Sequence, residues 1–134
     1  MGQEPSADAP IRVLIADDHL MFAEALTTLL ERHDRIDVVG AATSGPDAID
    51  QTLMRKADVV VMDVGMPGID GFETTRRLRT IAPTTRVIVL TGLSDDGLEE
   101  RAADAGASAL LTKGAADREV VDAILAVYDE RLNL

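Results

Sequence analysis

The sequence predicts an α/β protein of one domain, in which helices cover both faces of a doubly wound parallel sheet. Short apolar runs rich in β-branched residues alternate with amphipathic stretches along the chain. Near-continuous runs of this kind are typical of strands that are buried on both sides. The length of 134 residues suits one domain, and 46% hydrophobic with 28% charged residues is a globular composition.

Five apolar runs are the predicted strands, at residues 11–16, 36–41, 59–62, 87–90 and 107–111. The stretches between and after them have helical periodicity and predict helices at residues 20–30, 46–56, 71–81, 95–105 and 117–131. The third helix must end before Pro83, because the residue that precedes a proline disfavours helical geometry. Residues 1–10 contain two prolines and no apolar periodicity, so we expect a disordered tail before a domain at 11–131.

Composition excludes several classes of function. The net charge of -11 opposes binding of this chain to nucleic acid or to an anionic membrane surface. The absence of cysteine excludes a thiol nucleophile and a cysteine zinc site, and with two histidines we expect no metal site built from histidine. No apolar run reaches the ~20 residues of a membrane span. The first residues lack the features of a signal peptide, so we expect a cytoplasmic protein with no membrane partner.

Polar residues with matching chemistry stand at the ends of four predicted strands. Asp17 and Asp18 follow the first strand, Asp63 follows the third, Thr91 follows the fourth, and Lys113 lies two residues past the fifth. In a doubly wound sheet, ligands bind at the carboxyl ends of the strands. Carboxylates suit Mg²⁺, a hydroxyl and an ammonium suit phosphoryl oxygens, and an aspartate can act as the nucleophile in phosphoryl transfer.

Each of these residues alone has a structural explanation. Asp17 or Asp18 could cap the first helix, since aspartate is a preferred N-cap residue. Asp63 could form a turn, Thr91 could end a strand, and Lys113 could be a solvated lysine. The whole set, in order at four strand ends, favours a functional site.

The sequence resembles the receiver domain of bacterial two-component response regulators over about residues 11–130. The matching segments are Leu14–His19, Val61–Gly68, Val89–Gly92 and Gly106–Lys113. Asp17, Asp63, Thr91 and Lys113 are separated by 46, 28 and 22 residues. The Asp-Asp-His start and the long first helix resemble the NarL/LuxR-type subfamily in particular.

This resemblance implies a flavodoxin-like fold, with five parallel strands in the order 2-1-3-4-5 and five helices. It implies a signalling switch that catalyses only its own phosphorylation and dephosphorylation. The phosphodonor would be a phosphohistidine on a sensor histidine kinase. Members of the subfamily usually carry a DNA-binding helix-turn-helix domain after the receiver, so residues 132–134 would begin a linker to an output domain absent from this chain.

The resemblance also assigns roles to individual residues. Asp63 would be the phosphoacceptor, and the Thr91 hydroxyl and the Lys113 ammonium would contact phosphoryl oxygens. The Mg²⁺ ligands would be Asp17, Asp18, Asp63 and the backbone carbonyl of Gly65.

Three residues bear on the conformational switch. Leu110 stands where the family usually has an aromatic residue, so we expect coupling to run through the loop after Thr91. Residues 94–96 resemble an N-cap segment, which would place Gly97 in the first turn of the fourth helix and weaken its start. A homodimer through the fourth and fifth helices would reinforce the shift.

Two alternatives remain open at this stage. A degenerate receiver would act as a phosphorylation-independent interaction module, which Leu110 and Gly114 (where many receivers have proline) leave open. A haloacid-dehalogenase-type phosphatase also uses aspartate, Mg²⁺, threonine and lysine, but its nucleophile follows the first strand in an Asp-x-Asp pattern, which adjacent Asp17 and Asp18 do not form. Repeated turnover of a phosphate ester would distinguish the phosphatase from a protein that labels itself once.

Overall fold

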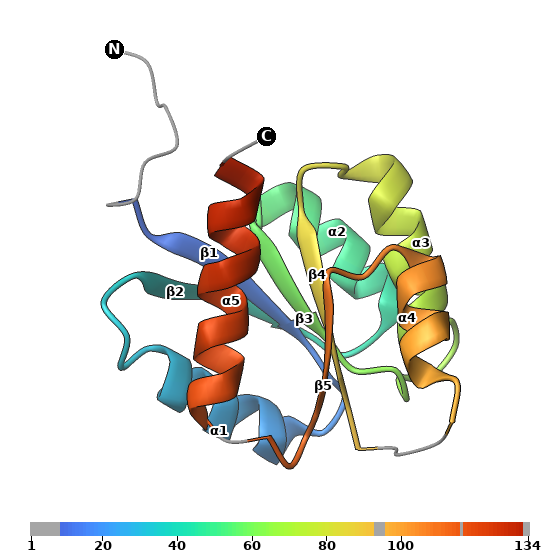
Figure 1. Cartoon of the computed structure of the whole chain (residues 1–134), viewed down its shortest axis with the longest axis horizontal. Coiled ribbons are helices and arrows are strands. Elements are labelled where there is room, and N and C mark those ends of the chain that lie inside the picture. The colour runs from blue at the N-terminus through green and yellow to red at the C-terminus, as the bar shows by residue number, and fades with distance from the viewer. Residues whose placement is uncertain (1–8, 93–95, 116, 133–134) are drawn as a thin grey trace.

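The computed structural model describes residues 9–92, 96–115 and 117–132, in which five strands alternate with five helices (Figure 1). The strands are β1 (Ile11–Ala16), β2 (Ile36–Ala42), β3 (Val59–Met62), β4 (Arg86–Thr91) and β5 (Ala109–Thr112). The helices are α1 (Leu20–Leu30), α2 (Gly45–Arg55), α3 (Gly71–Ile81), α4 (Leu98–Ala105) and α5 (Asp117–Leu132). Every strand pair is parallel and the order is β2-β1-β3-β4-β5, which confirms the predicted topology.

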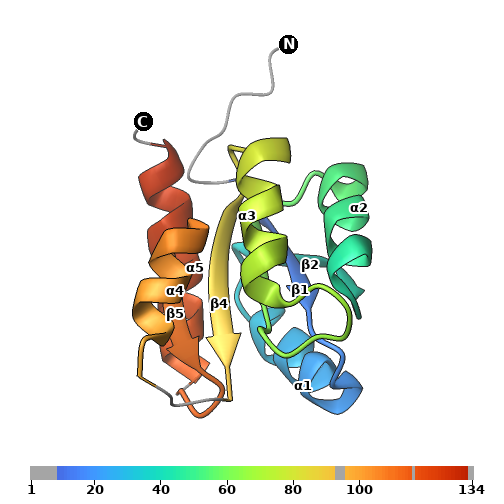
Figure 2. The same cartoon turned by 90° about the vertical axis from the view of Figure 1, so that its right-hand side faces the viewer.

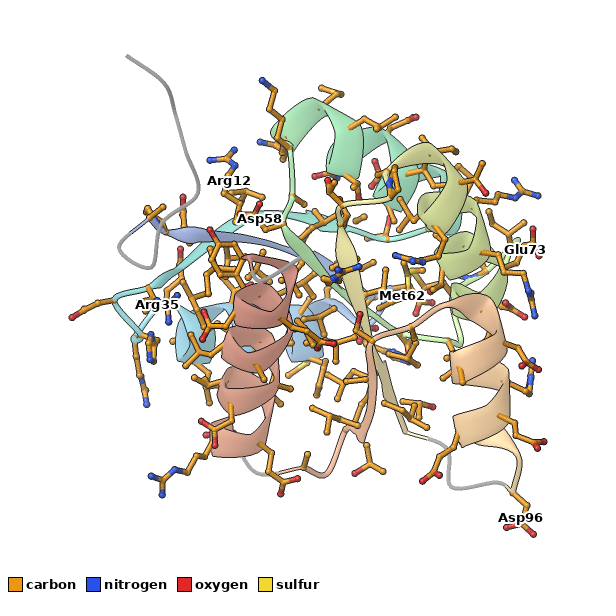
Figure 3. All side chains as sticks on the ribbon, turned by 45° about the horizontal axis from the view of Figure 1, so that its top comes forward. Arg12, Arg35, Asp58, Met62, Glu73 and Asp96 are labelled. Atoms are coloured by element: carbon orange, nitrogen blue, oxygen red, sulfur yellow. The ribbon has the colours of Figure 1, made fainter. Side chains whose placement is uncertain are left out.

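The sheet is covered on both faces by helices (Figures 1 and 2). On one face, β1 side chains such as Leu14 pack with residues of α2, α3 and α4. On the other face, side chains such as Ile15 pack with α1 and α5. Strand β3 is buried along its whole length, and Met62 lies in the interior in Figure 3, whereas Glu73 and Asp96 lie at the surface. Burial on both sides explains why the strands are continuous apolar runs.

Local capping sets the ends of the helices. The Ser44 hydroxyl accepts a hydrogen bond from the backbone N–H of Asp47 at the start of α2. Asp70 does the same for Glu73 at the start of α3, and α3 ends at Ile81, as Pro83 predicts. None of the helices in the described ranges has the length and apolar character that a membrane span requires.

Helix α4 is shorter than predicted. It begins at Leu98, and Gly97 is its N-cap residue with a φ of 87°, so the placement of Gly97 in the first turn is wrong. A left-handed φ is accessible to glycine at little cost but strains other residues, so glycine here permits the turn into the helix. Asp96 precedes this turn, and residues 94 and 95 of the predicted cap lie outside the described residues.

Three strand ends also differ from the prediction, and the first is β2, which extends one residue further, to Ala42. Thr91 is the last residue of β4, and β5 runs from Ala109 to Thr112, so Lys113 follows β5 directly. The reason is pairing between the strands, because Thr91 pairs with Thr112 and the Lys113 N–H donates to the Thr91 carbonyl at 2.7 Å. The shift places Lys113 at the same edge of the sheet as the residues that follow β1 and β3.

Candidate functional site

The carboxyl ends of the parallel strands meet at the lower edge of the sheet in Figure 1. Asp17 follows β1, Asp63 follows β3, Thr91 ends β4 and Lys113 follows β5. Asp17, Asp63 and Thr91 are buried, with 3%, 4% and 1% of their surface exposed, whereas Asp18 is exposed. A cleft of about 600 Å³ opens at this edge. Its lining residues are His19, Met21, Phe22, Asp63, Val64, Gly65, Thr91, Gly92 and Lys113.

Backbone hydrogen bonds hold the two buried aspartates in place. The Asp17 N–H donates to the Ala42 carbonyl and the Asp63 N–H donates to the Ala16 carbonyl, each at 2.9 Å, which continues the sheet pairing past the strand ends. The start of α3 packs closely beneath Asp63, because a Cβ added at Gly71 would overlap the Asp63 carbonyl oxygen. The carboxylates therefore project from a rigid base.

The Asp17 carboxylate does not act as the N-cap of α1. His19 occupies the N-cap position, and its backbone N–H donates to Asp17 Oδ1 at 2.8 Å. The alternative in which Asp17 or Asp18 caps the first helix is therefore not the arrangement observed.

Three carboxylates and one imidazole form a cluster that could hold a metal ion. One ligand atom each from Asp17, Asp18, His19 and Asp63 lies within 4.8 Å of the others. Among the described side chains, Asp63 Oδ2 is one of the buried polar atoms without a hydrogen-bond partner. A buried carboxylate oxygen that lacks a donor is well matched to a cation, and an oxygen-rich donor set of this kind fits Mg²⁺.

The electrostatic environment of Asp63 disfavours its charged form. Burial raises the pKa of the Asp63 carboxyl above its usual value, and the neighbouring Asp17 charge raises it further. Lys113, the Gly65 N–H and His19 act in the opposite direction but do not cancel the increase in the pKa. Burial and the second carboxylate both disfavour the charged form of Asp63, and a cation bound beside it would offset both effects.

Lys113 supplies the ammonium group of the site. Its Nζ lies 2.8 Å from Asp17 Oδ2 and 3.6 Å from Asp63 Oδ1. The same ammonium lies over the Phe22 ring, 4.6 Å from its centroid, which is within the range of a cation–π contact. Lys113 therefore reaches both buried carboxylates from the end of β5, across β4.

Comparison with known proteins identifies the family of this chain. Residues 13–125 match the family model of the response regulator receiver domain. The chain belongs to this family.

Individual relatives agree with this assignment. The chain is 42% identical over 118 residues to the response regulator GacA of Pseudomonas viridiflava, which covers 88% of this chain and 55% of the relative. It is 41% identical over 118 residues to the response regulator UvrY of Escherichia coli K12, with 88% and 54% covered. The chain thus spans about half the length of these curated relatives.

A solved structure is also similar. The two-component response regulator of the LuxR family from Aurantimonas sp. SI85-9A1 superposes with a TM-score of 0.86 at 32% identity, over 92% of this chain and 88% of that one. The resemblance to NarL/LuxR-type receivers seen in the sequence is thereby supported by a structure.

The residues predicted to act in the switch lie at different distances from the cleft. Thr91 lines it, whereas Leu110 is half-buried and packs against the core cluster that includes Leu98 of α4. Gly97 does not line the cleft. In this receiver, Leu110 therefore lies between the sheet and α4, and Gly97 lies at the start of the same helix.

No role in the site was predicted for His19, which ends the matching segment Leu14–His19, or for Phe22. Both lie at the start of α1, and both line the cleft. The one available signal was their position, since the N-terminus of the helix that follows β1 must face the carboxyl end of the sheet.

Proposed function

We propose that this chain is the phosphoryl-accepting switch of a two-component system, with Asp63 as the acceptor. The observation that carries the proposal is the Asp63 carboxylate. It is buried, has one oxygen without a hydrogen-bond partner, and lines a cleft shared with Thr91 and Lys113. The donor would be a phosphohistidine of a sensor histidine kinase.

In the proposed transfer, a carboxylate oxygen of Asp63 forms a bond to phosphorus. The phosphorus–nitrogen bond of the phosphohistidine breaks, and the imidazole of the kinase leaves with the electron pair and takes up a proton. Asp17, Asp18, Asp63 and the Gly65 carbonyl would hold Mg²⁺, which when bound supplies positive charge to the phosphoryl oxygens. Hydrolysis of the aspartyl phosphate by water would restore the carboxylate.

Lys113 and Thr91 would stabilise the transferred group from the protein side. The ammonium of Lys113 already lies between the two buried carboxylates, so a short movement would bring it to a phosphoryl oxygen. Thr91 is buried at the end of β4 and lines the same cleft, so its hydroxyl could contact a second oxygen. Loss of either contact should slow the transfer, because phosphoryl transfer depends mainly on positioning and charge stabilisation.

The output would be control of transcription through a DNA-binding domain that is not part of this chain. Two observations support this. The curated relatives are about twice as long as the matched region, and a similar solved structure is named a LuxR-family regulator. The net charge of -11 disfavours DNA binding by the receiver itself. We also propose a cytoplasmic location, where a kinase phosphohistidine would be accessible.

The convergence of all five predicted side chains favours this function over a degenerate receiver. Incubation with acetyl phosphate should add one phosphoryl group, measured by intact mass, and only when Mg²⁺ is present. Asp63→Asn should abolish the addition, because an amide is a poor nucleophile. Asp104→Asn, at an exposed position on α4, is the matched control and should label like the parent.

Two results would contradict the proposed function. Equal labelling of Asp63→Asn and the parent would exclude Asp63 as the acceptor. Repeated hydrolysis of a phosphate ester without a labelled intermediate would favour a phosphatase instead.

A further inference from the structure

The His19 imidazole lies among the carboxylate oxygens of the cluster. Its Nδ1 is 2.9 Å from Asp17 Oδ1, 3.6 Å from Asp18 Oδ1 and 3.9 Å from Asp63 Oδ2. An octahedral ion with ligands at about 2.1 Å sets neighbouring ligand atoms about 3 Å apart and opposite ones about 4.2 Å apart. All three distances fall close to or within this interval.

The side chain is not forced into this position by packing. It is 64% exposed, so other rotamers that point to solvent are open to it. Its Nδ1 faces Asp17 Oδ1 at 2.9 Å and Lys113 Nζ at 3.1 Å, and it cannot donate to the first and accept from the second at once. When it accepts from Lys113, its lone pair points at Nζ, which shows that the lone pair is free of a proton and open to a cation in that position.

We propose that His19 Nδ1 is a protein ligand at the metal site, beside Asp17, Asp18 and Asp63. The proposal rests on the acidic metal site of the proposed function and adds a nitrogen donor to it. The buried Asp63 Oδ2, which has no hydrogen-bond partner, is a further sign that this space takes a cation. A site of oxygens alone suits Mg²⁺, whereas imidazole favours Ni²⁺ and similar transition metals.

The consequence is a change in metal selectivity. A nitrogen ligand should raise the affinity for Ni²⁺ much more than the affinity for Mg²⁺, which binds imidazole weakly. Lys113 would lose its contact with Nδ1 when an ion binds there but could keep its contact with Asp17 Oδ2, which is a different oxygen. The proposed ligand therefore need not displace the ammonium from the site.

Calorimetric titration of the tag-free chain with Ni²⁺ and with Mg²⁺, in the absence of phosphodonor, tests this. His19→Ala should weaken Ni²⁺ binding roughly ten-fold or more, since replacing even a residue that only orients a metal ligand costs about ten-fold or more in metal affinity. The same variant should change Mg²⁺ affinity less than about three-fold. His33→Ala is the matched control, since His33 lies beyond the other end of α1, and it should alter neither affinity. A Mn²⁺-loaded sample should show magnetic coupling to an imidazole nitrogen that disappears in His19→Ala.

Two outcomes would overturn the proposal. The first is a Ni²⁺ affinity unchanged in His19→Ala, and the second is an equal loss for Ni²⁺ and Mg²⁺, which a general electrostatic or folding effect would produce. Phosphorylation is measured separately with Mg²⁺. If Asp63 is labelled but the Ni²⁺ affinity does not depend on His19, only this inference fails. If Ni²⁺ binding requires His19 but Asp63 is never labelled, only the proposed function fails.

Discussion

Replacing Asp63 by asparagine should stabilise the domain at neutral pH. With an effective dielectric constant of about 20, attraction to Lys113 Nζ at 3.6 Å is about 5 kcal/mol, and repulsion from Asp17 at up to 4.8 Å is about 3.5 kcal/mol or more. These two effects largely offset each other. What remains in the parent is the cost of burying a carboxylate oxygen without a hydrogen-bond partner, about 1–3 kcal/mol. Because this cost is larger for a charged group than for a neutral one, the amide of asparagine reduces it.

The pH dependence has a defined sign. Burial and the Asp17 charge raise the pKa of Asp63 in the folded protein above its ordinary value of 3.8. Stability associated with this carboxyl is therefore fully present below the unfolded pKa and is lost as pH rises through the folded pKa. Asp63→Asn removes that loss, so its advantage over the parent should be largest near pH 7 and should shrink toward pH 4.

Thermal unfolding followed by circular dichroism, with chelator present to keep metal out of the site, measures the effect. We expect Asp63→Asn to gain about 1 kcal/mol at pH 7, which corresponds to about 3–5 °C in Tm for a domain of this size. Asp104→Asn is the control and should change Tm by much less. A variant that is less stable than the parent at pH 7, or an advantage that grows on acidification, would refute the electrostatic reasoning.

Two glycines give further predictions. Gly97→Ala should lose about 1–2 kcal/mol in urea denaturation, because the φ of 87° strains a residue with a Cβ although nothing lies within 4 Å of it. Gly114→Ala, whose added Cβ meets nothing closer than 4.0 Å, should change stability little, and equal losses in the two variants would contradict this explanation. Gly71→Ala should lower both Tm and the rate of labelling by acetyl phosphate, because the added carbon overlaps the Asp63 backbone. Unchanged labelling in that variant would show that the start of α3 does not position the acceptor.

The sheet and most of the helices were predictable because their signals are local. Continuous β-branched runs mark strands that are buried on both faces, and Pro83 limits α3 from its own position in the sequence. The residues at the strand ends followed from topology alone, since parallel strands bring their carboxyl ends to one edge. That is why Asp63 and Lys113 could be paired across 50 residues of sequence.

The remaining features depend on geometry that no local pattern encodes. Whether Gly97 starts α4 or precedes it depends on its φ angle, and that angle depends on how the chain enters the helix. The contact of Lys113 with the Phe22 ring depends on how α1 packs against the end of β5. The direction of the His19 ring likewise depends on the Asp17 carboxylate that binds its backbone N–H.

The site of phosphorylation is the most direct test of the central claim. The parent protein would be labelled with acetyl phosphate and Mg²⁺, reduced with borohydride to convert an aspartyl phosphate to homoserine, digested and sequenced by mass spectrometry. We predict a single modified residue at position 63. Modification at Asp17 or Asp18 instead, or no modification of correctly folded protein, would contradict the assignment of Asp63 as the phosphoacceptor.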